Sequence, residues 1–157
     1  MPFIYRRRVH FQDTDAAGVV FFANIFSMCH EAYEASLVAS GIALRDFFNN
    51  PNCAIPIAES KANFFRPMYC GDELHLSLTP QLISPNEFSI TYILAVTMND
   101  SEIELARRED AVQAFTRHVA IDPANRKRCP LSSSMLEWLQ QWNDVNKDTS
   151  LSDGCGA

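Results

Sequence analysis

Residues 11–24, with the sequence FQDTDAAGVVFFAN, mark the point at which this chain changes from one structural pattern to another. Ahead of this stretch, residues 3–12 alternate in polarity. Tyr5, Val9 and Phe11 fall on one face and basic side chains on the other, which is typical of a strand. Two aspartates, two alanines and a glycine then favour a turn. Beyond the turn, apolar side chains recur at helical spacing over most of the circumference, which predicts a long buried helix.

This helix is expected over residues 24–40, and the rest of the chain predicts mainly strands. The further expected elements are a short helix at residues 44–49, strands at 54–65, 72–79, 87–98 and 103–121, and a closing amphipathic helix at 131–142. Turns are expected at Pro85-Asn86 and Asn99-Asp100, and a bend or bulge at residues 107–110. Consecutive antiparallel strands around one buried helix define an α+β fold. We expect one domain over residues 1–142 and a polar, disordered tail over residues 143–157.

The composition excludes several classes of protein. The 157 residues carry a formal net charge of −6, whereas a general nucleic-acid binder needs a basic surface. No run approaches the ~20 apolar residues of a membrane span, so no membrane partner is expected. Five cysteines at irregular spacing, without a Cys-x-x-Cys pair, argue against a disulfide framework and a zinc site. We expect reduced thiols in a cytoplasmic protein, with Cys29 and Cys70 buried as small apolar groups.

Common catalytic signatures are absent from the sequence. It contains no G-x-S-x-G elbow, no glycine-rich phosphate loop and no H-x-x-x-H zinc pattern. The four scattered histidines are expected at the surface or as satisfied core residues, and the basic residues 6–8 as a solvated strand face. Glu31 and Glu34 differ, because a carboxylate on a mainly apolar helix needs a partner.

The pair Asp13 and Asp15 leaves three interpretations open. The two aspartates could form an Asx-type turn. They could bind a metal ion, although no convincing third ligand lies nearby in the sequence. One carboxylate could instead face the helix N-terminus, where free backbone N–H groups and the helix dipole attract a developing oxyanion. That arrangement suits acyl transfer, with the carboxylate as nucleophile or as general base for water. No metal or cofactor is expected.

The motif VxFxDTDAxGVVxxxN, which begins at Val9, resembles the signature of the hot-dog-fold acyl-CoA thioesterases of the 4-hydroxybenzoyl-CoA thioesterase type. The order of expected elements matches this family over residues 3–121. The resemblance implies an antiparallel sheet wrapped around one long central helix, an acyl-CoA substrate, and self-association as a dimer or tetramer. It places the catalytic carboxylate on Asp15 and the amide that polarises the thioester carbonyl on Phe22, with Gly18 allowing a tight approach.

Residues 56–67, PIAESKANFFRP, look closest to the cyanobacterial members of this family that hydrolyse 1,4-dihydroxy-2-naphthoyl-CoA in phylloquinone (vitamin K1) biosynthesis. This likeness implies a pocket for an aromatic acyl group. The residues expected to bind the substrate are Gly18, Val19, Phe21, Phe64, Phe65, Lys61 and Arg66. Phe88 and Phe115, two more of the 11 phenylalanines, are expected to face the helix entry.

The chain departs from the family pattern at two places. Members that act on 4-hydroxybenzoyl-CoA carry a basic cluster before the strand that here begins at Phe88, and this chain has SPNE at residues 84–87. Lys61, Arg66 or the basic residues 126–128 are expected to replace that cluster, since phosphates favour arginine and lysine. An early-helix position that is acidic in relatives is occupied by His30.

Two alternatives to an aromatic substrate remain open. The same chemistry could act on a short aliphatic acyl-CoA or on an acyl carrier protein. The chain could also be a non-catalytic module that binds acyl-CoA, since a fold does not fix a function.

Overall fold

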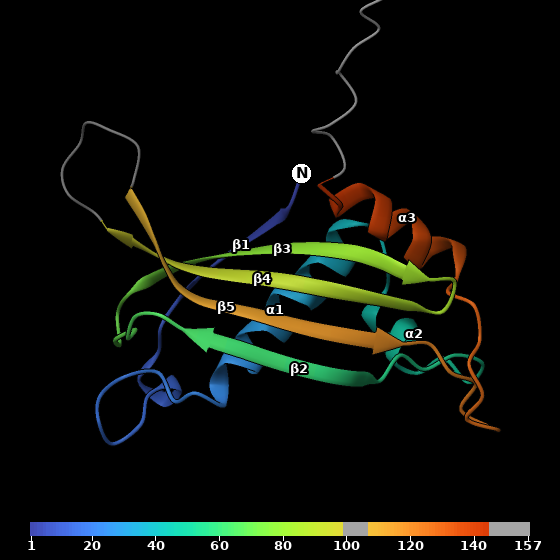
Figure 1. Cartoon of the computed structure of the whole chain (residues 1–157), viewed down its shortest axis with the longest axis horizontal. Coiled ribbons are helices and arrows are strands. Elements are labelled where there is room, and N and C mark those ends of the chain that lie inside the picture. Colours follow the sequence, from blue (N-terminus) through green and yellow to red (C-terminus); the bar gives the residue numbers. More distant parts are fainter. Residues whose placement is uncertain (99–106, 145–157) are drawn as a thin grey trace, which may run out of the picture.

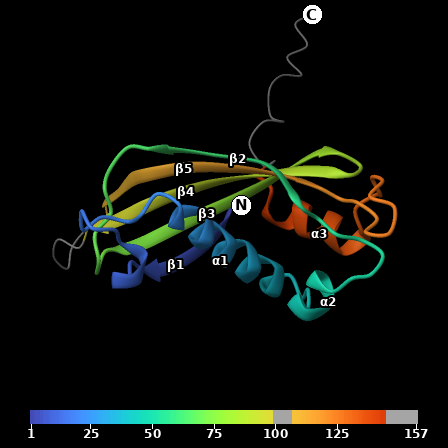
Figure 2. The ribbon, with the colours of Figure 1, turned by 90° about the horizontal axis from the view of Figure 1, so that it is seen from below.

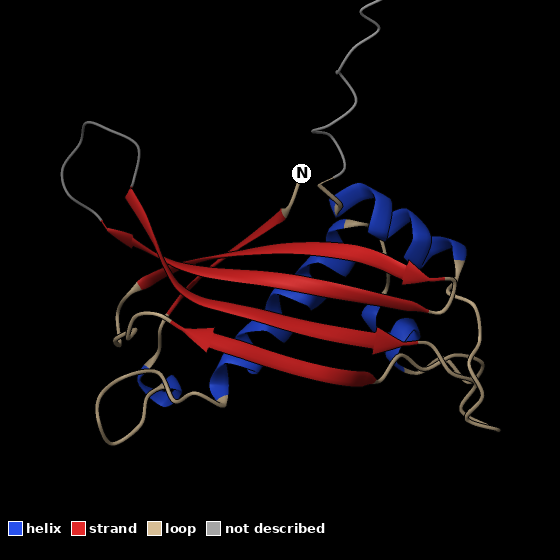
Figure 3. Ribbon diagram, in the orientation of Figure 1, coloured by secondary structure: helices blue, strands red, loops and turns tan. Residues whose placement is uncertain are grey.

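A twisted antiparallel sheet forms the framework of residues 1–98 and 107–144, the part of the chain that the computed structural model describes (Figures 1 and 3). Its strands are β1 (Phe3–Arg8), β2 (Ile57–Phe64), β3 (Glu73–Ser84), β4 (Glu87–Met98) and β5 (Arg107–Val119). The spatial order is β1-β3-β4-β5-β2, and every neighbouring pair is antiparallel. The expected α+β fold, a sheet around one long helix, is confirmed.

The helices pack on one side of this sheet, as Figure 2 shows. They are α1 (Asn24–Ala39), α2 (Leu44–Phe48) and α3 (Ser133–Trp142), and a short 3-10 turn, η1 (Phe11–Asp13), precedes α1. The side chain of Ser132 caps α3 by accepting a hydrogen bond from the backbone N–H of Met135 at 3.3 Å. None of the described helices is long and apolar enough to cross a membrane.

The central helix α1 is buried where it faces the sheet and where it faces α3. Ile25 and Met28 are fully buried there. On the opposite side of the helix, His30 and Glu34 are exposed, and Val38 is 56% exposed. The prediction that this helix is buried around most of its circumference is therefore wrong for the single chain.

The core lies between α1 and the inward face of the central strands. Its strand residues alternate along the chain and are all fully buried: Leu74, Leu76, Leu78, Phe88, Ile90, Tyr92 and Leu94. Each buried side chain of this size stabilises the fold by roughly 1.5–3 kcal/mol relative to leaving it exposed. Trp138 joins α3 to this core, because its buried Nε1–H donates to Ser36 Oγ of α1 at 3.0 Å.

The first strand is shorter than the sequence predicts. β1 ends at Arg8, and Phe11 is 84% exposed instead of sharing the buried face of Val9. The cause is η1, in which the backbone N–H of Asp13 bonds back to the carbonyl of His10 at 3.0 Å and turns the chain away from the sheet. The apolar alternation alone did not reveal this turn.

Other boundaries agree with the sequence to within a few residues. β4 has the predicted bounds, while β3 continues to Ser84. The register between β4 and β5 shifts at Ala111, directly after the charged run predicted to bend the strand. The turn predicted at Asn99-Asp100, the start of the last strand at residue 103 and residues 145–157 of the predicted tail lie outside the described residues. Of the two cysteines predicted to be buried, Cys29 is buried, whereas Cys70 is exposed.

Candidate active site

The loop between β1 and α1 is held in place by Asp13. Its Oδ2 accepts hydrogen bonds from Arg7 Nη2 and from the backbone N–H of His10, both at 2.8 Å. Its carbonyl oxygen accepts from the backbone N–H of Phe21 at 2.9 Å and from Asn24 Nδ2 at 3.0 Å. These four bonds join the strand end to the helix start. Asp13 is therefore a structural residue of the loop.

Arg7 connects the same loop to α1. Its side chain is only 7% exposed and also pairs with Glu31 Oε2 at 3.2 Å. Tyr5 donates to this carboxylate at 3.2 Å, and burial together with Glu31 raises the pKa of Tyr5. The prediction of a solvated face is wrong for Arg7, and Glu31 has the partner it was expected to need, whereas Glu34 is exposed. The alternation of Tyr5 and Val9 already placed Arg7 on their face, a signal that the sequence reading missed.

Asp15 lies on the surface of the chain, at the tip of the loop. Its Oδ1 accepts from the backbone N–H of Ala17 at 2.8 Å, which confirms the Asx-turn interpretation for this residue. Within the described residues no group donates to its Oδ2. The carboxylate therefore has one oxygen engaged and one available. The expected apolar pocket does not enclose it in a single chain.

Gly18 serves the turn by its backbone conformation. Its φ of +81° lies in the left-handed region, which residues with a side chain rarely adopt. Its N–H donates to the carbonyl of Asp15 at 3.0 Å. A Cβ added there would meet nothing within 4 Å. The chain itself therefore places no group close to Gly18, where a tight approach was expected.

The backbone N–H of Phe22 donates to no protein group in the part of the chain that the structure describes, whereas the N–H of Phe21 is bonded to the carbonyl of Asp13. The carbonyl of Phe22 already accepts from Ile25 at the first turn of α1. A free N–H at a helix N-terminus carries partial positive charge, so it can stabilise an oxyanion. The rings of Phe21 and Phe22 make a T-shaped contact with their centroids 4.9 Å apart, and Phe22 is 65% exposed.

A cavity of about 300 Å³ lies beside this loop. It is lined by Val19, Val20, Ile25, Phe64, Phe65, Arg66, Pro67 and Met68. The fold thus brings together four predicted substrate-binding residues from two distant parts of the sequence: Val19, Phe64, Phe65 and Arg66. The loop is tied to this wall, since Val20 N–H donates to the carbonyl of Met68 at 2.8 Å and Val19 O accepts from Asp15 N–H at 2.9 Å.

The chain matches a family model described as the thioesterase-like superfamily over residues 9–139. It belongs to that superfamily. It is 49% identical over 140 residues, 89% of this chain and 88% of the relative, to the 1,4-dihydroxy-2-naphthoyl-CoA hydrolase of Nostoc punctiforme. It is also 46% identical over 136 residues to the 1,4-dihydroxy-2-naphthoyl-CoA hydrolase of Rippkaea orientalis. That match covers 87% of this chain and 94% of the relative.

Among solved structures, a 1,4-dihydroxy-2-naphthoyl-CoA thioesterase from Synechocystis superposes with a TM-score of 0.77 at 32% identity. The match covers 94% of this chain and 100% of the other. The hot-dog fold is thereby confirmed, and the protein is a thioesterase, so the interpretation as a non-catalytic module does not hold. Within its described residues, no cluster of three or more His, Cys, Asp or Glu side chains could hold a metal ion.

One predicted binding residue of the thioesterase, Lys61, lies away from the first cavity, as do Phe88 and Phe115. Lys61 faces the opposite side of the sheet, where its ammonium lies 4.7 Å from the centre of the Phe115 ring. Phe115 therefore does not face the helix entry, because successive strand residues point to opposite faces. Phe88 lies in the core, stacked on His118 at 4.6 Å. The prediction that these two phenylalanines face the helix entry is therefore wrong.

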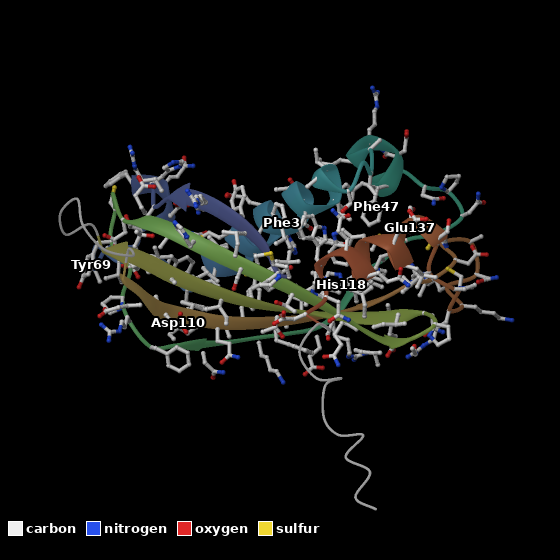
Figure 4. The ribbon with its side chains drawn as sticks, turned by 90° about the horizontal axis from the view of Figure 1, so that it is seen from above. Phe3, Phe47, Tyr69, Asp110, His118 and Glu137 are labelled. Atoms are coloured by element: carbon white, nitrogen blue, oxygen red, sulfur yellow. The ribbon has the colours of Figure 1, made fainter. Side chains whose placement is uncertain are left out.

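A second cavity of about 280 Å³ opens between α1 and the start of β2. It is lined by His30, Tyr33, Glu34, Phe48, Ile55, Pro56, Ile57 and His118. His118 is 1% exposed, lies in the layer between sheet and helices (Figure 4), and bonds through Nε2 to Thr116 Oγ1 at 2.9 Å. Burial, and secondly His30, lower its pKa to about 4. The alternation of β5 places this histidine on the core face, although sequence reasoning did not single it out.

Proposed function

We propose that this thioesterase hydrolyses 1,4-dihydroxy-2-naphthoyl-CoA to 1,4-dihydroxy-2-naphthoic acid and CoA, a reaction of phylloquinone biosynthesis. One observation carries the mechanism: the available Asp15 oxygen and the free Phe22 N–H belong to one loop, and that loop borders an apolar cavity lined by Phe64 and Phe65. The named relatives, 46–49% identical along most of the chain, support the acyl group. Aromatic rings suit a flat bicyclic acyl group.

Asp15 supplies the reactive oxygen in this proposal. Either it attacks the thioester carbonyl, expels CoA thiolate and leaves an anhydride that water opens, or it removes a proton from the water that attacks. In both routes the carbonyl oxygen of the thioester becomes negatively charged and accepts a hydrogen bond from the Phe22 N–H. Repeated turnover in ¹⁸O-labelled water tests for the anhydride. Label in the peptide that contains Asp15 identifies an anhydride that water opens at the Asp15 carbonyl, whereas label in the product alone fits either general-base attack or an anhydride opened at the acyl carbonyl.

We infer that a second subunit completes the pocket. Among the described residues β2 is an edge strand with no partner on its other side, and it exposes Ile57 and Phe64, at 40% and 51%. Unpaired edges favour pairing with another strand. If two β2 strands pair antiparallel about a two-fold axis, the Phe64 end of one subunit meets the Ile57 end of the other. The cavity beside Asp15 would then continue into the partner's second cavity, and the exposed side of α1 would be covered.

The phosphates of CoA need basic side chains that are not already neutralised. Arg66 pairs with Glu109, and Lys61 lies 3.9 Å from Glu59, so both cations have acidic neighbours. Arg126 and Lys127, in the hairpin after β5, form no ion pair within the described residues, whereas Arg128 pairs with Glu87. Lys61 and Arg66 remain proposed contacts, and the 126–128 hairpin is the better supported anchor. A pantetheine thioester, which lacks the nucleotide, should then be insensitive to Arg126→Ala.

The deciding experiment measures thiol release from a panel of thioesters. It contains 1,4-dihydroxy-2-naphthoyl-CoA, benzoyl-CoA, acetyl-CoA and an acyl-carrier-protein thioester. We expect kcat/KM for the naphthoyl substrate to exceed that for acetyl-CoA by at least about 100-fold, because an apolar pocket discriminates by the surface it buries. A preference for acetyl-CoA or for the carrier protein would replace the proposed substrate while keeping the thioesterase chemistry.

A further inference from the structure

Two cysteines that are distant in the sequence lie side by side in the fold. The Sγ atoms of Cys53 and Cys129 are 3.5 Å apart, with the Cys129 S–H directed at Cys53. Both side chains are half-buried. Their backbones are held by a small three-stranded arrangement in which Ala54 pairs with Ile121 and Ile121 pairs with Arg128. The proximity of the thiols is therefore fixed by backbone hydrogen bonds on both sides.

We propose that Cys53 and Cys129 are a modification site at which a reversible intrachain disulfide forms. The oxidant is a disulfide, either a small molecule such as glutathione disulfide or a dithiol–disulfide protein. One cysteine thiolate attacks the external disulfide, forms a mixed disulfide and releases one reduced thiol. The second cysteine then attacks the mixed disulfide and releases the second reduced thiol. The two protons of the cysteine thiols end on the two released thiols, and two electrons pass from the cysteines to the oxidant.

The surroundings of Cys53 make it slow to react as the first nucleophile. Burial, and then the neighbouring Cys129 thiol, raise the pKa of Cys53 to about 11. Since only the thiolate attacks, Cys53 is a poor first nucleophile at neutral pH. The second attack is intramolecular, across a gap that must close from 3.5 Å to the disulfide length of about 2.0 Å.

The disulfide would join two segments at one end of the sheet. Cys53 lines a cavity of about 310 Å³ together with Tyr33, Phe48 and Ile55, next to the cavity that contains His118. The bond would attach the segment that leads into β2 to the strand of the hairpin that follows β5. It would close a long loop of the chain, so the oxidised protein should unfold at a higher temperature. This inference does not depend on the proposed substrate.

The test uses the full-length chain with Cys70→Ser and Cys155→Ser, which leaves Cys29, Cys53 and Cys129. The native protein is treated with glutathione disulfide and examined by intact mass and by peptide mapping. We expect a loss of two hydrogen atoms, a peptide linking Cys53 to Cys129, a melting temperature raised by several degrees, and full reversal by a dithiol reductant.

Matched variants make the result decisive. In Cys53→Ser and Cys129→Ser, each made in the same background, the loss of two hydrogen atoms should disappear and at most a glutathione adduct should remain. Cys29 is fully buried and its pKa is raised to about 12 by burial, so it should stay reduced. The proposal is overturned if the native protein gains only glutathione adducts, if the crosslink forms only in denaturant, or if the loss of mass persists in either serine variant.

Discussion

Two aspartates that stand two residues apart perform different tasks in this protein. The Oδ2 atom of Asp13 accepts from Arg7 and His10, so this carboxylate is committed to the loop. Asp15 uses one oxygen for an Asx turn and keeps the other available at the surface. The difference comes from their neighbours, since Arg7 reaches Asp13 at 2.8 Å from the buried face of β1.

Replacing Asp15 by Asn should abolish most of the activity while leaving the fold intact. The Asn Oδ1 can still accept from Ala17, whereas the nucleophile or general base is lost. We expect kcat for the naphthoyl substrate to fall by roughly 10²–10⁴-fold, with an unchanged melting temperature. Asp13→Asn is the matched control: it weakens the Arg7 pair, so its main effect should be on stability. Near-normal turnover in a folded Asp15→Asn variant would refute the proposed role.

His118 predicts a pH dependence of stability. Its folded-state pKa of about 4 lies below the ordinary value of 6.5, so between these values the unfolded chain binds a proton that the folded chain rejects. Stability from this residue is therefore complete above about pH 6.5 and falls as the pH drops toward 4, by at most about 3 kcal/mol. Urea midpoints at pH 7 and pH 5 measure the effect. His118→Gln should lose less stability than the wild type between these pH values, and equal losses would contradict the assignment.

At the scale of elements, the sequence predicts the helices and strands well because each has a regular apolar pattern. β4 and α3 follow it almost residue for residue. β3 continues past its predicted end at residue 79 to Ser84, and β1 ends early because its end depends on the hydrogen bonds of Asp13 and on the turn η1. Hydrogen bonds of this kind compete with the strand pattern and are not visible in apolar periodicity.

One buried hydrogen bond joins α3 to α1, beside the ring contact of Trp138 with Tyr33 and the bond from Trp142 Nε1–H to Ser40 Oγ. Ser36→Ala would leave the Trp138 Nε1–H without an acceptor inside the core. We expect the free energy of unfolding to fall by about 1–3 kcal/mol, as measured by urea denaturation. Ser132→Ala, at the exposed cap of α3, should cost a similar or smaller amount, about 0.5–2 kcal/mol, through a different mechanism. A Ser36→Ala variant as stable as the wild type would show that α3 docks without this bond.

At the scale of the whole molecule, the open edge of β2 and the exposed side of α1 predict a dimer. Sedimentation equilibrium should therefore give twice the chain mass. Ile57→Asp would place a charge at the predicted interface, so the dissociation constant should rise at least about tenfold, or 1.4 kcal/mol, and activity should fall with it. Leu136→Asp, on the exposed face of α3, is the control and should leave the dimer intact. A monomeric wild type with full activity would contradict the two-subunit pocket.

The sequence by itself determined the order and type of the elements, the α+β fold, and the loop that carries Asp15 and the Phe22 amide. These features depend on residues close together in the chain, whose spacing sets a strand, a turn or a helix directly. Only the tertiary structure decided which distant side chains meet. Strand pairing places Lys61 on the outer face and Phe64 on the inner one, and brings Cys53 to Cys129. Such contacts follow from register and sheet order, which no local pattern encodes.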